Sequence, residues 1–436
     1  MSRFIKSSIS FTSLSPMPLS TGNLVLLAVV TVLSASGCGR DPTTFVSDLQ
    51  ALGADVAIDE QGEIVEVQMN SNYHAAMELA CRISTIRELR IYGDLGDNFT
   101  DAEMRLLGRL TKLQRLAFYG TQVTDLGFAE VGKLVDLQML EMQNNHVTEM
   151  GFHVLRQNTK LESLDLRCIN LTDRSMTFIN SLPNLKSLTL VINHSITDSV
   201  FDEIKDVSGL ETVNLMMTSI GDKTLARLAK CRRLRTLNIA LTNVTEEGIE
   251  HLRPLSTLTE LKLTGKCESD ATAEWLASLR NLKSLSLGGK GLTDDGVELL
   301  SHLGCLEVLS FSEECRITDK SLEFLSRLSQ LATLSVSNPS ITDSGVEHLK
   351  HLPRLTSLMI SSKQLTDDSI MSILELSELK FLWLTGGHLT DVGALQLRTM
   401  PKLLSLHLAS SALTEHAKIE LQKQIMDVTI RNERDE

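Results

Sequence analysis

One phrase of about two dozen residues recurs along most of this chain. It reads ITDSGVEHLKHLPRLTSLMI from Ile341 to Ile360, and close versions begin at Val123, Val244 and Leu292. The first leucine of the LxxLxL segment returns every 24 residues, as from 113 to 137, with a step of 25 at two places. These leucines are Leu113, Leu137, Leu161, Leu185, Leu210, Leu234, Leu258, Leu282, Leu306, Leu331, Leu355, Leu379 and Leu403. A period of this length indicates stacked supersecondary units that bury their apolar faces against one another.

Each phrase combines a strand pattern with a helix pattern. The segment LTSLMI alternates apolar and polar residues, as a short strand does. The preceding TDSGVEHLKHL has Val346, Leu349 and Leu352 spaced by three, as on one helix face. Thr342 is a good N-cap, and Asp343 lies in the first turn, where the helix dipole favours an acid. Because such Thr-Asp or Thr-Glu pairs recur through the chain, we interpret them as helix caps rather than as calcium or acid–base sites.

Strand followed by helix, repeated without interruption, predicts a parallel sheet on one face and a row of helices on the other. Strands pack about 4.8 Å apart, whereas helices prefer 8–10 Å, so the stack bends with the sheet inside. A looser unit begins at Ile86, which brings the expected number to about 14 repeats of 24–25 residues. The predicted fold is therefore an α/β solenoid in the form of a horseshoe.

The repeat resembles that of the leucine-rich-repeat family. The segment LAKCRRLRTLNI (Leu228 to Ile239) is loosely similar to the cysteine-containing subtype, although most other units have leucine where Cys231 stands. The resemblance implies a right-handed α/β horseshoe with a concave sheet and convex helices. It also implies a binding protein that is not an enzyme and needs no cofactor, similar to exported bacterial repeat proteins.

The first 37 residues have the layout of a secretory signal. Arg3 and Lys6 precede the apolar run NLVLLAVVTVL, which is too short to span a bilayer comfortably. The segment Ala35-Ser36-Gly37-Cys38 then resembles a bacterial lipobox, with alanine where leucine is usual. We expect export to the cell envelope with a lipid on Cys38. An uncleaved membrane anchor and ordinary secretion are the alternatives.

The repeats are expected to be closed at both ends. Residues 38–85 contain a helical pattern from Phe45 and two strand patterns around the turn at 59–62, which predicts an N-terminal cap of a helix and a β-hairpin. This cap would cover the open end of the repeats at 86–424. Residues 425–436 read as a closing strand and a charged tail.

Several kinds of chemistry are disfavoured. The net charge of −13 without a long basic run argues against nucleic acid, whose binding depends on Lys and Arg. His348 and His351 lie three apart, but two ligands without a nearby thiolate or carboxylate cluster do not make a metal site. Cys267 and Cys315 hold the same slot two repeats apart, about 10 Å, which is too far for a disulfide. We therefore predict free thiols, no metal and no catalytic residues.

The predicted binding surface is the concave sheet, since solenoids use this face for recognition. Side chains alternate along a strand. The leucines therefore point into the core, and the residues between them line the concave face. Aromatic and Arg side chains, which dominate interface energies, gather there at two ends. The N-terminal patch is Arg90, Tyr92, Arg115 and Tyr119, and the C-terminal patch is Met359, Phe381, Trp383 and His407. A protein or peptide ligand is favoured; a carbohydrate ligand and a purely structural role remain alternatives.

The lipobox generates a direct test. Replacing Cys38 by alanine removes the thiol that would carry the lipid, and two acyl chains are what hold a lipoprotein firmly in a membrane. The Cys38→Ala protein should be released from the membrane fraction or accumulate unprocessed, as seen by fractionation and intact mass. A variant that stays in the membrane at its normal processed size would contradict the lipobox.

Overall fold

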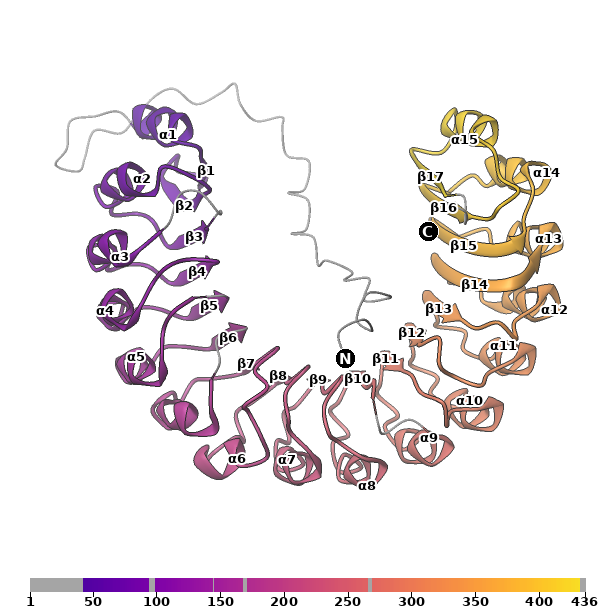
Figure 1. Ribbon diagram of the computed structural model, residues 1–436, viewed down its shortest axis with the longest axis horizontal. Helices are drawn as coiled ribbons and strands as arrows, with labels where there is room; N and C mark the ends of the chain where they lie inside the picture. Colours follow the sequence, from indigo (N-terminus) through magenta and orange to yellow (C-terminus); the bar gives the residue numbers. More distant parts are fainter. Residues whose placement is uncertain (1–41, 94–98, 144, 168–170, 266–268, 432–436) are drawn as a thin grey trace, which may run out of the picture.

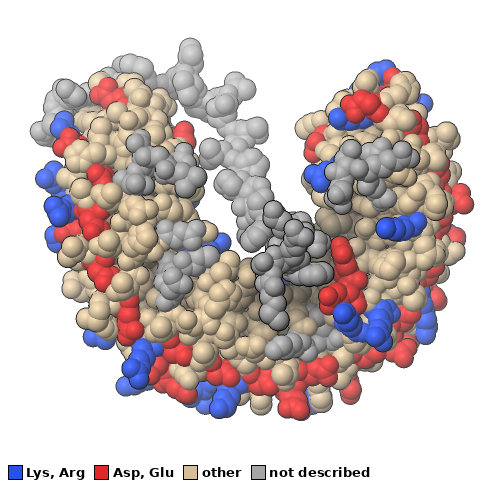
Figure 2. Space-filling view, in the orientation of Figure 1, with Lys and Arg blue, Asp and Glu red and all other residues tan. Residues whose placement is uncertain are grey.

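The computed structural model describes residues 42–93, 99–143, 145–167, 171–265 and 269–431, which form one open horseshoe (Figure 1). Strands line the inside of the curve and helices the outside. Charged side chains gather along the outer circumference, over the helices (Figure 2). The signal segment and Cys38 lie outside the described residues. No helix of the described part is both long and apolar enough to cross a membrane.

The inner layer is a 17-stranded sheet. Its strands are β1 (Ala54–Ile58), β2 (Ile64–Met69), β3 (Glu88–Tyr92), β4 (Arg115–Tyr119), β5 (Met139–Gln143), β6 (Ser163–Arg167), β7 (Ser187–Thr189), β8 (Thr212–Asn214), β9 (Thr236–Asn238), β10 (Glu260–Lys262), β11 (Ser284–Leu287), β12 (Val308–Phe311), β13 (Thr333–Ser337), β14 (Ser357–Thr366), β15 (Phe381–His388), β16 (Ser405–Ala409) and β17 (Asp427–Arg431). From β2 onward each strand pairs in parallel with the next along the chain, as in Leu237↔Leu261↔Leu285.

The outer layer mixes α-helices with 3₁₀-helices (η). The α-helices are α1 (Pro42–Ala51), α2 (Tyr73–Ala80), α3 (Asp101–Leu107), α4 (Asp125–Phe128), α5 (Glu149–Phe152), α6 (Val200–Glu203), α7 (Asp222–Leu228), α8 (Glu246–Glu250), α9 (Asp270–Leu276), α10 (Asp294–Leu300), α11 (Asp319–Leu325), α12 (Asp343–Glu347), α13 (Asp367–Ile373), α14 (Asp391–Ala394) and α15 (Glu415–Gln422). The 3₁₀-helices are η1 (Ala129–Lys133), η2 (His153–Gln157), η3 (Asp173–Ser181), η4 (His348–His351) and η5 (Leu395–Thr399). A 24-residue period leaves room for one or two turns on this face.

The core lies between the two layers and runs the length of the solenoid. Leu237, Leu261 and Leu285 are fully buried in successive strands, whereas Ser286 on the other face is half-buried. This alternation confirms the predicted strand register. In the N-terminal half, the buried rings of Phe128 and Phe152 pack with centroids 5.4 Å apart. Each repeat thus buries its apolar residues against its neighbours.

The N-terminal end differs from expectation in one respect. Helix α1 is followed by the antiparallel pair β1 and β2, but β2 also pairs in parallel with β3, with Val67 opposite Leu89. The repeat ladder therefore begins one strand before the predicted start at Ile86. The sequence predicts this strand as half of the cap hairpin but not as the first strand of the repeat sheet, because Val67 and Met69, both fully buried, stand in the inward positions where later repeats mostly have leucine.

Adjacent repeats are joined by hydrogen bonds between the Thr-Asp pairs. Thr342 Oγ1 accepts a bond from the Ser344 N–H and so caps its own helix, as predicted. Asp319, one repeat earlier, accepts the Thr342 N–H at 2.8 Å and the Thr342 hydroxyl at 2.6 Å. The same pair of hydrogen bonds joins most neighbouring repeats. The acceptors are Asp101, Asp125, Asp173, Asp222, Asp270, Asp294, Asp319, Asp343, Asp367 and Asp391. We call this series the Asp–Thr ladder.

The ladder explains the glycine that often stands two residues after the Thr-Asp pair, as Gly345 does after Asp343. A Cβ atom on Gly345 would lie 2.2 Å from Asp319 Oδ1, so the close approach of the two repeats requires glycine. The ladder weakens where glutamate replaces aspartate. Thr172 Oγ1 lies 3.4 Å from Glu149, and the buried Ser269 Oγ, which follows the Glu246 repeat, has no hydrogen-bond partner among the described residues.

The first helix of the ladder has no preceding aspartate and is capped from within its own repeat. The Thr100 N–H and hydroxyl both donate to Glu103, at 2.8 and 2.7 Å, and form a capping box. Of the described cysteines, Cys81, Cys231 and Cys305 are free thiols. Burial raises the pKa of the Cys81 thiol to about 11 and that of Cys231 to about 12, so both stay protonated.

The ladder predicts where a carboxylate matters. Asp319→Ala leaves two donors of Thr342 without their acceptor, so the free energy of unfolding should fall by about 1–3 kcal/mol. Glu246→Ala, at the equivalent position of a repeat where the ladder is interrupted, is the matched control and should cost less than about 0.5 kcal/mol. Urea unfolding of both variants measures the difference. Equal losses would show that these acids act through the helix dipole rather than across the repeats.

Candidate functional site

The concave face has the residue columns that the sequence predicts. Arg90, Ala117 and Glu141 stand side by side at the N-terminal end, and Met359, Trp383 and His407 at the C-terminal end. All eight residues of the two predicted patches lie on this face, four on β3 and β4 and four on β14, β15 and β16. The two patches are set on opposite arms of the horseshoe (Figure 1).

In the N-terminal patch, two tyrosines stack on neighbouring strands. The rings of Tyr92 and Tyr119 are 5.1 Å apart between centroids, with an angle of 21° between their planes. The Tyr119 hydroxyl donates to Glu141, and the Tyr73 hydroxyl beneath the patch donates to the Tyr92 carbonyl. Burial and the neighbouring Glu141 raise the pKa of Tyr119 above its ordinary value, so its phenol remains a donor. Glu141 is a member of this patch that sequence reasoning did not single out.

Both arginines of the N-terminal patch are held by acids of the same chain. Arg90 pairs with Glu88 and, at 3.3 Å, with Glu66. Arg115 lies 3.5 Å from the other oxygen of Glu88. Burial, together with the charge of Glu88, raises the pKa of Glu66. The sequence identifies these arginines as exposed anchors, but their charge is already balanced inside the molecule.

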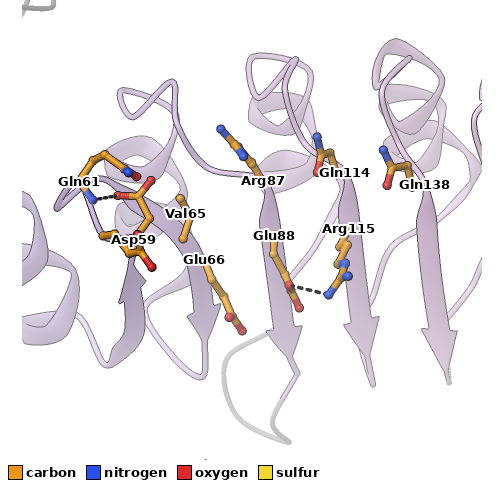
Figure 3. A pocket seen from close by; sticks show the side chains of 10 residues that line it. Asp59, Gln61, Val65, Glu66, Arg87, Glu88, Gln114, Arg115 and Gln138 are labelled. Atoms are coloured by element: carbon orange, nitrogen blue, oxygen red, sulfur yellow. Dashed lines mark hydrogen bonds and ion pairs between the residues drawn. The ribbon is translucent and has the colours of Figure 1, made fainter. Parts of the chain in front are cut away.

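A hollow of about 500 Å³ lies beside this patch, where strands β2 to β5 begin and the β1–β2 turn approaches them. Arg87, Gln114 and Gln138 stand in a row along its rim, and Glu66, Glu88 and Arg115 line it from the strands (Figure 3). It is open and polar, with both signs of charge. It therefore adds a hydrogen-bonding border to the patch rather than an enclosed site.

The C-terminal patch is apolar and outward-facing. Met359, Phe381 and Trp383 are 38%, 49% and 39% exposed, although each is a large apolar side chain on a packed sheet. Leu404, which precedes β16 and was not predicted as part of the patch, is 43% exposed. Contiguous exposed apolar side chains on a folded protein mark interaction sites.

Trp383 and His407 form the centre of the C-terminal patch. Their rings stack at 3.8 Å between centroids, with 28° between planes. Burial and the nearby Arg431 lower the pKa of His407 below 6.5. The imidazole is therefore neutral at pH 7 and lies against the indole as an apolar surface. The indole N–H donates to Thr385 Oγ1 at 3.3 Å.

Metal chemistry finds no support in the described residues, where no group of three or more His, Cys, Asp or Glu side chains could hold an ion. His348 and His351 lie on η4 at the convex side. The arrangement as a whole is a curved surface with two unlike ends, one ion-paired and polar, the other apolar.

The geometry defines an open α/β solenoid of leucine-rich repeats. Residues 67–324, more than half of the chain, match the leucine-rich repeat region family, and the chain belongs to it. An internalin from Listeria monocytogenes has a similar solved structure, with 22% identity and a TM-score of 0.52 over 80% of this chain and 90% of that one. A leucine-rich-repeat protein from Leptospira interrogans has 16% identity and a TM-score of 0.48 over 84% and 89%. No curated protein matches this chain.

The stacked pair predicts a pH response. The folded pKa of His407 is lowered from 6.5, so protonation favours the unfolded chain, and stability should decrease as the pH falls below about 6.5. In a Trp275→Phe background, Trp383 emission should be quenched by the protonated imidazole with a midpoint below pH 6.5. His407→Gln should abolish this titration. A midpoint at or above 6.5 would show that the ring is not shielded as described.

Proposed function

We propose that the chain is a non-enzymatic scaffold that binds a protein or peptide ligand on the concave face of the horseshoe. The observation that supports this most directly is the C-terminal patch, where apolar rings point outward from an otherwise well-packed sheet. Exposed aromatic side chains of this kind contribute interface energy out of proportion to their number. The N-terminal patch contributes less, because its arginines already have partners.

The stacking geometry favours polypeptide over carbohydrate. Side chains on neighbouring strands stand about 4.8 Å apart. Centroid distances of 5.1 Å for Tyr92 and Tyr119, and of 3.8 Å for Trp383 and His407, mean that the rings stand upright side by side. Each ring has one face covered by its neighbour. A sugar ring could stack only on the remaining face of each ring, whereas a protein side chain can pack against that face and against the ring edges.

The proposed location is the bacterial cell envelope, with the chain exported and held in a membrane by lipid on Cys38. This part of the proposal depends on the signal layout and the lipobox of the sequence. An anchored body with its helices outward and an open concave face can meet soluble or membrane-bound ligands.

Two double variants test the binding face. Phe381→Ala with Trp383→Ala should lower the capture of envelope proteins by at least tenfold, while Tyr92→Ala with Tyr119→Ala should have the smaller effect. Phe381, Trp383 and Tyr92 are exposed, whereas Tyr119 is half-buried and bonded to Glu141, so thermal unfolding is measured first and should change least for the Phe381 and Trp383 pair. Pull-down from solubilised envelopes, compared with the unmodified protein, gives the result. Full capture by both folded variants would move the binding site to the convex helices.

A further inference from the structure

The concave face changes character between its two arms. Strands β3 to β6 carry Arg90, Arg115, Glu141, Asp165 and Arg167 in their concave positions. From β11 to β16, the two concave positions paired in register on each strand hold no Asp, Glu, Lys or Arg. They are Ser284, Ser286, Val308, Ser310, Thr333, Ser335, Ser357, Met359, Phe381, Trp383, Ser405 and His407. In a chain with 22% charged residues, these twelve concave positions carry no Asp, Glu, Lys or Arg, and we call them the neutral half of the concave face.

Two components make up this neutral half. The apolar wall consists of Met359, Phe381 and Trp383. The hydroxyl floor beside it consists of Ser284, Ser286, Ser310, Thr333, Ser335, Ser337, Ser357 and Ser361. All floor side chains are half-buried, and within the described part of the chain none of their hydroxyls has a hydrogen-bond partner. Each hydroxyl is both a donor and an acceptor, as a peptide group is.

We infer that the apolar wall and the hydroxyl floor bind an extended, uncharged segment of a partner protein that carries one aromatic or branched aliphatic side chain. The inference rests on the proposed function and specifies its ligand. The side chain packs beside Trp383 and Phe381, where apolar area is exposed. The segment's backbone runs across the floor, where N–H and C=O groups meet free hydroxyls.

Electrostatics selects the uncharged segment. A charged side chain brought onto this surface loses water and finds no opposite charge in the concave positions of β11 to β16. His407 does not supply one, because its lowered pKa keeps it neutral at pH 7. A neutral segment loses only hydrogen bonds to water, which the floor hydroxyls can replace. Charged ligands are directed instead to the N-terminal arm, where they compete with existing ion pairs.

The test uses synthetic 12-residue peptides and fluorescence anisotropy with the full mature chain. The host sequence is Ser, Thr, Asn and Gln, with a central Trp, Phe or Leu. Matched peptides have alanine in place of that residue, or two Lys or two Glu beside it. We expect the neutral anchored peptides to bind at least tenfold more tightly than the alanine and charged versions. Phe381→Ala with Trp383→Ala should abolish the difference.

A pair of substitutions in the same strand position provides the matched control. Ser357 on β14 lies opposite Phe381, whereas Ser187 on β7 occupies the equivalent half-buried position outside the floor. Ser357→Asp should weaken the neutral anchored peptides at least tenfold, and Ser187→Asp should leave them unchanged. Both variants are checked for unchanged thermal unfolding before binding is measured.

The outcomes separate this inference from the proposed function. If the concave double variants lose envelope proteins but the charged peptides bind as well as the neutral ones, the uncharged ligand is wrong while the binding face stands. Equal effects of Ser357→Asp and Ser187→Asp would also overturn it. Binding of oligosaccharides on a glycan array in place of the peptides would assign the floor to sugars. If every concave variant still binds all its ligands, both proposals are wrong.

Discussion

The fold depends on a carboxylate that bonds the next repeat rather than its own. Asp319 accepts two bonds from Thr342, and the same arrangement joins most neighbours along the solenoid. Apolar burial is non-directional. The buried leucines of one repeat would therefore pack against those of the next in more than one relative position of the helices. The ladder is directional and fixes the approach of neighbouring helix starts wherever an aspartate faces the threonine of the next repeat. Thr342 therefore has two functions, as N-cap of its own helix and as donor to the preceding repeat.

The bonds that hold the repeats together lie on the convex side and the candidate binding residues on the concave side. The two sets do not overlap: the inward leucines and the ladder occupy fixed positions, while the concave positions vary from Arg90 through Ser286 to Trp383. Ser357, for example, is a concave residue that takes no part in the Asp–Thr ladder or in the buried leucine core. The surface can therefore carry a polar, ion-paired arm and a neutral, apolar arm on one framework.

Sequence predicts the fold well because the period fixes the neighbours. A 24-residue step places Leu261 beside Leu285, and the model confirms both the strand register and the concave columns. The sequence predicts less well which side chains of the concave face contact one another. Arg90 pairs with Glu88 on its own strand and with Glu66 on the strand before, and Arg115 pairs with Glu88 on the neighbouring strand, so the sequence predicts exposed anchors where balanced pairs exist. The sequence predicts strand β2 as part of the cap hairpin but not its parallel pairing with β3, because Val67 and Met69 depart from the leucine pattern.

All hydrogen bonds of the Asp–Thr ladder point the same way along the chain, from a threonine to the aspartate of the preceding repeat. Most repeats offer an acceptor to the following repeat and donors to the preceding one, so the pattern itself sets no limit on the number of repeats. If a whole repeat is inserted or deleted, the remaining threonine donors still face an aspartate acceptor. Termination needs a local substitute, and Glu103 supplies one where the first threonine, Thr100, has no aspartate before it. The length of the horseshoe is thus a property of its ends, and the reach of its concave face can change by whole repeats without any new kind of contact.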